Sequence, residues 1–150
     1  MINTNQQPTC QDLVQDKFNN IESDYKLARK FFEEYQDATE GEQIAMEVLD
    51  KHRGDWFHEY DDLYDYFCNS LLSFDHVGDH GEGGYYRLQL SWGGPSDEFR
   101  VYTNEDAEIQ KIEYWYMDWF DGASIEISKD SESWSLCDLY LEPEKSLLRW

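Results

Sequence analysis

The sequence is poor in basic residues, and this shortage limits what the protein can bind. Its 150 residues include 12 Lys and Arg against 33 Asp and Glu, so the formal net charge is −21. Direct recognition of nucleic acid needs a cationic footprint, and an anionic membrane surface attracts cations for the same reason. We therefore expect neither nucleic acid nor membrane as a direct partner, whereas a cationic protein would be steered towards this chain.

Cysteine is scarce as well. Three cysteines stand far apart and form no CxxC pair. An odd, widely spaced set is typical of free thiols in a reducing compartment and not of a disulfide framework. The first residues lack the basic and apolar segments of a signal peptide, and no apolar run approaches the roughly 18 residues of a membrane span. We therefore expect a cytoplasmic protein.

Aromatic residues, by contrast, are abundant at 17% of the chain. Disordered acidic chains lack such residues, so the composition predicts a folded protein with large, rigid side chains in its core. The length suits one domain, and neither a linker nor an internal repeat divides the sequence. The sequence therefore predicts a single domain over 1–150, with disorder limited to 1–8.

Apolar periodicity predicts a helical half over 9–74. After Thr9, a plausible N-cap, apolar residues recur at alternating spacings of four and three as far as Tyr35. This repeat predicts one long helix or two collinear ones. We expect the apolar side of this helix to pack on the core of its own domain or, alternatively, to form the seam of a homodimer. Thr39 has the form of a capping box, Gly54 suits a helix end, and Asp55 suits the next beginning, so we expect three to four helices.

The period changes to two after the glycine-rich segment 75–84. Over 85–150, alternating apolar residues and short turns predict four strands in an antiparallel meander with one buried face. Asp130 or Ser131 then begins a last helix, which Pro143 would end. The sequence therefore predicts an α+β fold in which an N-terminal helical layer is followed by a four-stranded antiparallel meander and a C-terminal helix.

Patterns for catalysis and metal binding are weak. The best metal-like cluster comprises Asp75, His76, Asp79, His80 and Glu82. A glycine-rich loop fixes no ligand geometry there, and Cys68 and Cys137 stand at apolar helix positions where thiols are usually inert. We therefore expect no catalytic residue, no cofactor and no metal. A metal-dependent enzyme that uses the loop of His76 and His80 stays as an alternative.

Carboxylates and aromatics mark the residues that we expect to bind a partner. They are Glu33, Glu34, Asp37, Glu59, Asp61, Asp62, Asp65, Trp115, Trp119 and Asp121. The segment around Trp115 and Trp119 has more aromatic rings than one sheet of a thin domain can bury. Exposed tryptophans beside carboxylates are typical of binding hot spots.

The acidity of a foldable chain indicates what kind of partner this surface suits. Duplex DNA carries one charge per about 1.7 Å of its axis, and a rigid body dense in carboxylate could replace it in a basic cleft. We therefore expect an acidic inhibitor that occupies the cleft of a DNA- or RNA-targeting protein as a mimic of nucleic acid. An immunity protein that neutralises a basic nuclease toxin would show the same acidity and stays as an alternative.

The small size, the acidity and the lack of catalytic motifs resemble the anti-defence proteins of phages and plasmids, which are anti-CRISPR and anti-restriction inhibitors. The stretch from YYRLQLSWGGPSDEFRVY to IEYWYMDWFDGA, residues 85–123, is also similar to uncharacterised small bacterial and phage proteins. The resemblance implies an inhibitor of the DNA-mimic class that acts in the host cytosol. It implies no catalytic residue and leaves the target open.

Overall fold

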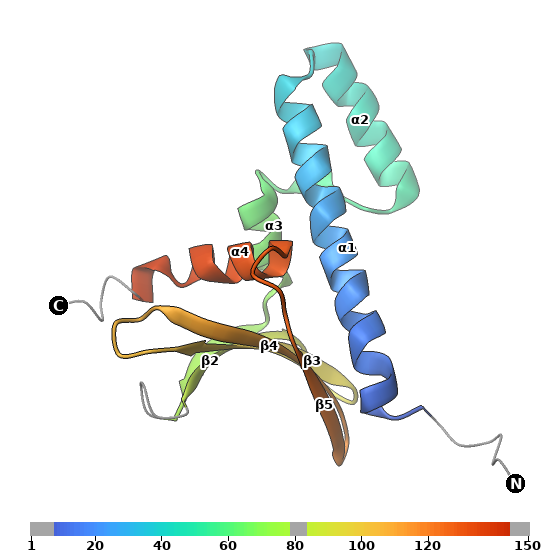
Figure 1. Cartoon of the computed structure of the whole chain (residues 1–150). Helices are drawn as coiled ribbons and strands as arrows, with labels where there is room; N and C mark the ends of the chain where they lie inside the picture. The colour runs from blue at the N-terminus through green and yellow to red at the C-terminus, as the bar shows by residue number, and fades with distance from the viewer. Residues whose placement is uncertain (1–7, 79–83, 145–150) are drawn as a thin grey trace, which may run out of the picture.

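The computed structural model describes residues 8–78 and 84–144. They form an α+β fold in which the helices lie on one face of a five-stranded antiparallel sheet (Figure 1). The predicted class is confirmed, as is the order of helical region, antiparallel sheet and C-terminal helix. The predicted number of four strands is wrong. The disorder expected for 1–8 concerns residues that, apart from Pro8, lie outside the described ranges.

A single helix, α1 (Cys10–Asp37), runs along the whole molecule. A capping box begins it, because the Thr9 side chain accepts from the Asp12 amide and the Asp12 carboxylate accepts from the Thr9 amide. Its buried stripe comprises Cys10, Val14, Phe18, Glu22, Tyr25, Ala28 and Phe31. Since the protein's own core covers this stripe, the alternative that it forms a homodimer seam is wrong.

The next helix, α2 (Glu40–Arg53), has the predicted ends. The Thr39 hydroxyl accepts from the amide of Glu42, and Gly54 ends the helix in the left-handed conformation with φ of 82°. The helix predicted to begin at Asp55 begins later. A short 3-10 helix, η1 (Phe57–Glu59), comes first, and Asp62 then caps α3 (Leu63–Ser70).

The strands pair in sequence order as an antiparallel meander. They are β1 (Ser73–Val77), β2 (Tyr85–Ser91), β3 (Ser96–Thr103), β4 (Ile109–Asp118) and β5 (Asp121–Glu126). Strand β1 is the one that the sequence did not predict, because it has little alternation of its own. Pairing with β2 stabilises it, and the Asp75 carboxylate accepts two hydrogen bonds, of 3.0 and 2.6 Å, from Arg87.

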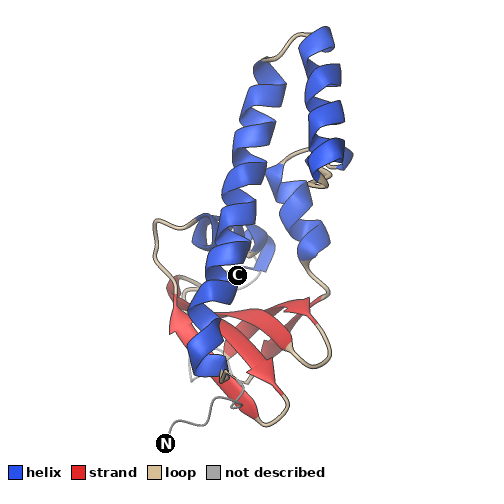
Figure 2. Ribbon diagram, turned by 90° about the vertical axis from the view of Figure 1, so that its right-hand side faces the viewer, coloured by secondary structure: helices blue, strands red, loops and turns tan. Residues whose placement is uncertain are grey.

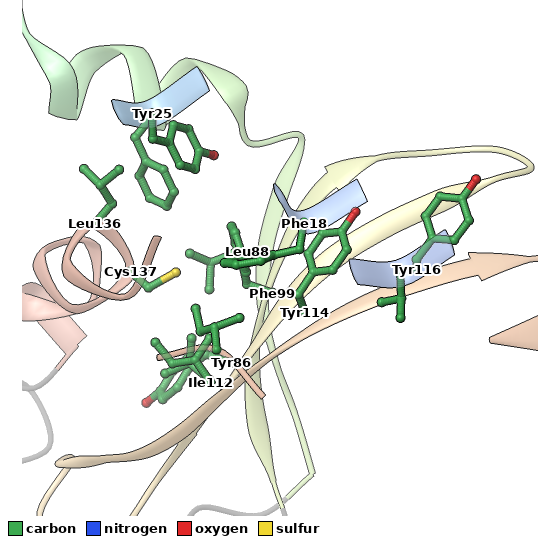
Figure 3. Close-up of a cluster of buried hydrophobic side chains, with 14 of the residues drawn as sticks. Phe18, Tyr25, Tyr86, Leu88, Phe99, Ile112, Tyr114, Tyr116, Leu136 and Cys137 are labelled. Atoms are coloured by element: carbon green, nitrogen blue, oxygen red, sulfur yellow. The ribbon is translucent and has the colours of Figure 1, made fainter. Parts of the chain in front are cut away.

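The inner face of the sheet forms the core with α1, α3 and α4 (Glu132–Tyr140) (Figure 3). Phe18 of α1 lies against Tyr114 of β4 with ring centroids 5.7 Å apart, and Cys137 of α4 is fully buried in the same cluster. Ser131 is the N-cap of α4, as one of the two predicted alternatives. Among the described residues, the helices thus cover one face of the sheet only.

Beyond the sheet, the second half of α1 and α2 form a hairpin that projects from the body (Figure 2). A second, smaller cluster of Ala28, Phe31 and Phe57 holds its base. Along α2 itself only Asp50 is buried. None of the helices within the described ranges is both long and apolar enough to cross a membrane.

Candidate functional site

Three of the predicted partner-binding residues converge at the end of the projecting hairpin. Glu33, Glu34 and Asp37 lie in the last turns of α1 and, with Glu42 of α2, line an open hollow of about 520 Å³. The helical spacing of four places Glu33 and Asp37 on one side of α1. We call this set of four carboxylates the acidic hollow.

The three α1 carboxylates of the acidic hollow are not placed to stabilise their own helix. The C-terminus of a helix carries the negative end of the macrodipole, so carboxylates there are unfavourable by about 0.3–1 kcal/mol each at exposed sites. α1 has no basic residue in its last turn that would offset them. A cation bound in the hollow would relieve both the dipole and the repulsion between the carboxylates.

The predicted acids of the η1–α3 segment divide into two kinds. Asp62 accepts from the amide of Asp65 at 2.7 Å, and Asp65 accepts from the amide of Asp61 at 3.0 Å. These two carboxylates therefore build the first turn of α3. The side chains of Glu59 and Asp61 are exposed and remain candidates for partner contact.

Asp121 has a structural role at the opposite end of the molecule. Its Oδ2 accepts a hydrogen bond of 2.8 Å from the backbone amide of Cys10 at the start of α1. The negative charge there is favourable, because the first turn of a helix presents unpaired amides and the positive end of the dipole. This hydrogen bond by itself accounts for a carboxylate at this position. The predicted contact between Asp121 and a partner stays a prediction.

Next to Asp121, the turn from β4 to β5 exposes two large aromatic side chains. Trp119 is 87% exposed and Phe120 is fully exposed, and Trp92 in the turn from β2 to β3 is 78% exposed. The exposure predicted for Trp119 is confirmed. We call Trp92, Trp119 and Phe120 the aromatic end; an open hollow of about 490 Å³ adjoins it, lined by Gly93, Gly94, Ser96, Met117 and Trp119.

Trp119 also has an unfavourable backbone. Its φ is 56°, in the left-handed region that favours glycine. A bulky residue in this conformation costs of order 1 kcal/mol and is found mostly where function retains it. The sequence predicted the turn at Asp121–Gly122, two residues later than the structure has it, and it did not predict the exposure of Phe120. Asp121 instead begins β5.

Trp115 differs from Trp119 because a neighbouring cation covers it. On the outer face of the sheet the Arg100 guanidinium lies 4.0 Å from the ring centroid of Trp115 and 4.9 Å from that of Tyr85. Arg100 also pairs with the buried carboxylate of Glu98 at 2.8 Å. Trp115 is thus held inside an ordered cation–π stack, and its predicted role in partner binding stays a prediction.

Only part of the predicted metal-like cluster falls within the described residues. His76 lies on β1 with its ring against Tyr86, at a centroid distance of 4.7 Å, while Asp79, His80 and Glu82 lie outside the described ranges. Within those ranges no group of three or more His, Cys, Asp or Glu is placed to hold a metal ion. The loop alternative therefore stays a prediction.

A contact between His58 and Asp50 stabilises the fold. His58 donates its backbone amide to Asp50 at 2.8 Å, and its Nδ1 lies 2.7 Å from the same Oδ2. Asp50 is completely buried at the base of the hairpin. Since His58 follows α2 in the chain, the pair joins the end of α2 to η1.

Comparisons of the chain with protein-family models, with curated proteins and with solved structures found no match.

Proposed function

We propose that this protein is an acidic inhibitor that enters the basic cleft of a nucleic-acid-binding protein, as anti-CRISPR and anti-restriction proteins of the DNA-mimic class do. The observation that carries the proposal is the acidic hollow, in which four carboxylates converge at the end of a projecting hairpin. Three of them, Glu33, Glu34 and Asp37, occupy the end of α1 where negative charge is unfavourable, and a cationic partner would make that position favourable.

The shape of the hairpin suits entry into a cleft. α1 has 28 residues and is therefore about 40 Å long at 1.5 Å per residue. The acidic hollow lies at its free end, so a partner's groove can receive it without contact from the sheet. A guanidinium placed between Glu33, Glu34 and Asp37 could donate bidentate hydrogen bonds to the carboxylates.

The field of the whole molecule adds to this local site. Twelve cations cannot neutralise 33 carboxylates, so a large negative charge remains after every internal ion pair has formed. Single exposed ion pairs contribute only about 0–1 kcal/mol. We therefore attribute the choice of partner and fast association to the summed potential. We attribute the position and orientation of the bound partner to the acidic hollow.

The aromatic end supplies the apolar contact that exposed carboxylates lack. It lies by the start of α1, at the opposite end from the acidic hollow, because Asp121 joins the last hairpin to Cys10. Trp and Phe side chains with this exposure dominate the energy of many interfaces. A partner large enough to reach both ends would combine electrostatic steering with hydrophobic anchoring.

The test compares two triple variants that change the net charge equally. Glu33→Gln/Glu34→Gln/Asp37→Asn neutralises the acidic hollow, and Glu105→Gln/Asp106→Asn/Glu108→Gln neutralises three exposed acids of the β3–β4 loop. Each tagged protein is used to capture partners from a bacterial lysate, with and without duplex DNA as competitor.

We expect the unmodified chain and the loop variant to capture the same basic nucleic-acid-binding protein, and the hollow variant to lose it. Duplex DNA and added salt should both release the captured protein. The proposal is wrong if the captured protein does not bind nucleic acid, if DNA does not compete, or if both variants lose it equally.

A further inference from the structure

The apolar side of α2 faces solvent. Ile44, Val48 and Leu49 are 57–62% exposed, and Ala45 beside them is exposed too. An amphipathic helix of an isolated domain normally turns its apolar side inwards. The exposed stripe therefore indicates that α2 packs against a surface outside this chain's own core.

The side of α2 that faces α1 carries polar contacts beside Met46, which packs against the cluster of Ala28, Phe31 and Phe57. Gln43 donates to the carbonyl of Tyr35 at 2.9 Å, the Tyr35 hydroxyl donates to Glu47 at 2.5 Å, and Asp50 is buried. These hydrogen bonds fix the rotation of α2 about its own axis. The apolar stripe cannot turn towards α1 without breaking them, so its exposure is built into the hairpin.

We propose that a second copy of this chain covers the stripe, with the two α2 helices packed antiparallel about a two-fold axis. The charges of α2 are arranged for this pairing, since its first turn carries Glu40 and Glu42 and its end carries Lys51 and Arg53. In a two-fold interface, a contact from residue i of one copy to residue j of the other is repeated from residue j of the first copy to residue i of the second.

The spacing of these charges places them correctly for ion pairs across the axis. Glu40 and Lys51 are eleven residues apart, about three turns, so they lie on one side of the helix, and Glu42 and Arg53 share the other side in the same way. In an antiparallel pair centred on the midpoint of α2, Glu40 of each copy lies about 3 Å along the axis from Lys51 of the second copy, within reach of its long side chain.

The apolar residues are equally self-complementary. The midpoint of α2 falls between Met46 and Glu47, so Ile44 lies level with Leu49 of the second copy. Gly41 has no neighbour within 4 Å of an added Cβ, and it stands one turn before Ala45. Such small side chains allow two helices to approach closely.

The stripe continues into the groove between α1 and α2. An open hollow of about 260 Å³ there is lined partly by Leu27, Phe31, Met46 and Leu49. Leu27 is 46% exposed, so a second copy that covers Leu49 would also cover part of this groove. The apolar contact thus extends beyond α2 alone.

The same charges argue against a uniformly basic occupant. Lys51 would repel such a partner at one end of the stripe, where Arg53 already pairs with Asp55 at 3.2 Å, whereas the reversed copy of α2 matches both ends. The contact surface of one short helix pair is small, so we expect self-association on the order of micromolar. The inference does not rest on the proposed function.

The first test uses two leucines with nearly equal exposure. Leu49 on the stripe is 60% exposed and Leu72, before β1, is 61% exposed. Sedimentation equilibrium of the full chain across the micromolar range, at about 0.15 M salt to screen the net charge, should show a monomer–dimer equilibrium. Leu49→Glu should weaken it at least about tenfold, and Leu72→Glu should leave it unchanged.

The second test exchanges charges. Glu40→Lys and Lys51→Glu should each lose self-association, while an equimolar mixture of the two variants should form a heterodimer. The double variant Glu40→Lys/Lys51→Glu should self-associate again at the original net charge. Circular dichroism verifies that each variant is folded.

Any of four results overturns the inference. The unmodified chain stays monomeric across the concentration range, or Leu49→Glu associates as strongly as the unmodified chain. Alternatively, the mixture of the two charge variants fails to associate, or some other protein binds a monomeric chain at this stripe.

Discussion

The carboxylate of Glu22 on α1 holds Ser133 at the start of α4. Glu22 Oε1 accepts from the Ser133 amide at 3.0 Å and from its hydroxyl at 2.7 Å. Its Oε2 accepts from the Glu132 amide at 2.8 Å. A buried carboxylate is thus stabilised by the unpaired amides and the positive dipole end of a helix that lies 111 residues away in sequence.

We expect Glu22→Leu to lower the free energy of unfolding by about 3 kcal/mol, because it leaves buried donors unpaired at the start of α4. Urea denaturation measures the change. Glu33→Gln, on the exposed side of the same helix, should change stability by less than about 0.5 kcal/mol. Equal effects of the two substitutions would contradict the anchoring role of Glu22.

Trp119→Gly should raise the free energy of unfolding by about 0.5–1 kcal/mol, because glycine removes the cost of a positive φ while little buried surface is lost. Trp92→Gly is the matched control, since Trp92 is also exposed but is not among the described non-glycine residues with positive φ. The control substitution should not raise the free energy of unfolding. If thermal melts show the same shift of the melting temperature for both variants, the backbone of Trp119 is not strained.

Two aspartates of α1 should respond to acid in opposite directions. Hydrogen bonds from Thr9 lower the pKa of Asp12 from its usual 3.8, so its contribution to stability is present above that pH and is lost as the pH falls through the lowered pKa. Burial, and then the charge of Asp55, raises the pKa of Asp24. Its ionisation therefore destabilises the fold as the pH rises through the raised pKa.

Asp12→Asn should consequently destabilise the protein at neutral pH, and Asp24→Asn should stabilise it. The difference for Asp24→Asn should shrink as the pH falls towards 3.8, and the difference for Asp12→Asn only as the pH falls further, through the lowered pKa of Asp12. Urea melts at a series of pH values measure this. If both variants change the free energy of unfolding in the same direction at neutral pH, the surroundings described for Asp12 or for Asp24 are wrong.

The three thiols should differ in reactivity. Cys10 and Cys137 are buried, and burial raises the pKa of both, whereas Cys68 is partly exposed. Because the thiolate is the reactive form, Ellman's reagent should modify one thiol quickly in the native protein and all three after unfolding. Cys68→Ser should remove the fast phase. A fast phase that survives this substitution would place the reactive thiol elsewhere.

Local signals predicted most of the helix boundaries. Thr9, Thr39 and Ser131 are N-caps and Gly54 ends α2, as their positions indicated. Each of these signals involves atoms within about four residues, so it can be read directly from the chain. The start of α3 was the exception, because η1 depends on the packing of Phe57 under α1.

The candidate site was predictable only where its residues share one helix. Glu33, Glu34 and Asp37 converge because helical spacing brings them together. Asp121 could not be assigned from sequence, since its donor, Cys10, is 111 residues away. Trp115 and Trp119 looked alike in sequence, but only Trp115 has an arginine stacked on its ring.

By itself, the sequence determined the net charge, the starts of three helices, the end of α2 and the alternation of β2 to β4, because these depend on composition and on near neighbours. Only the tertiary structure decided that β1 joins the sheet, that Glu22 caps α4 and that the apolar side of α2 faces outwards. These features rest on contacts between distant segments. Their free energy exists only once the chain has closed the intervening loops, so no local pattern encodes them.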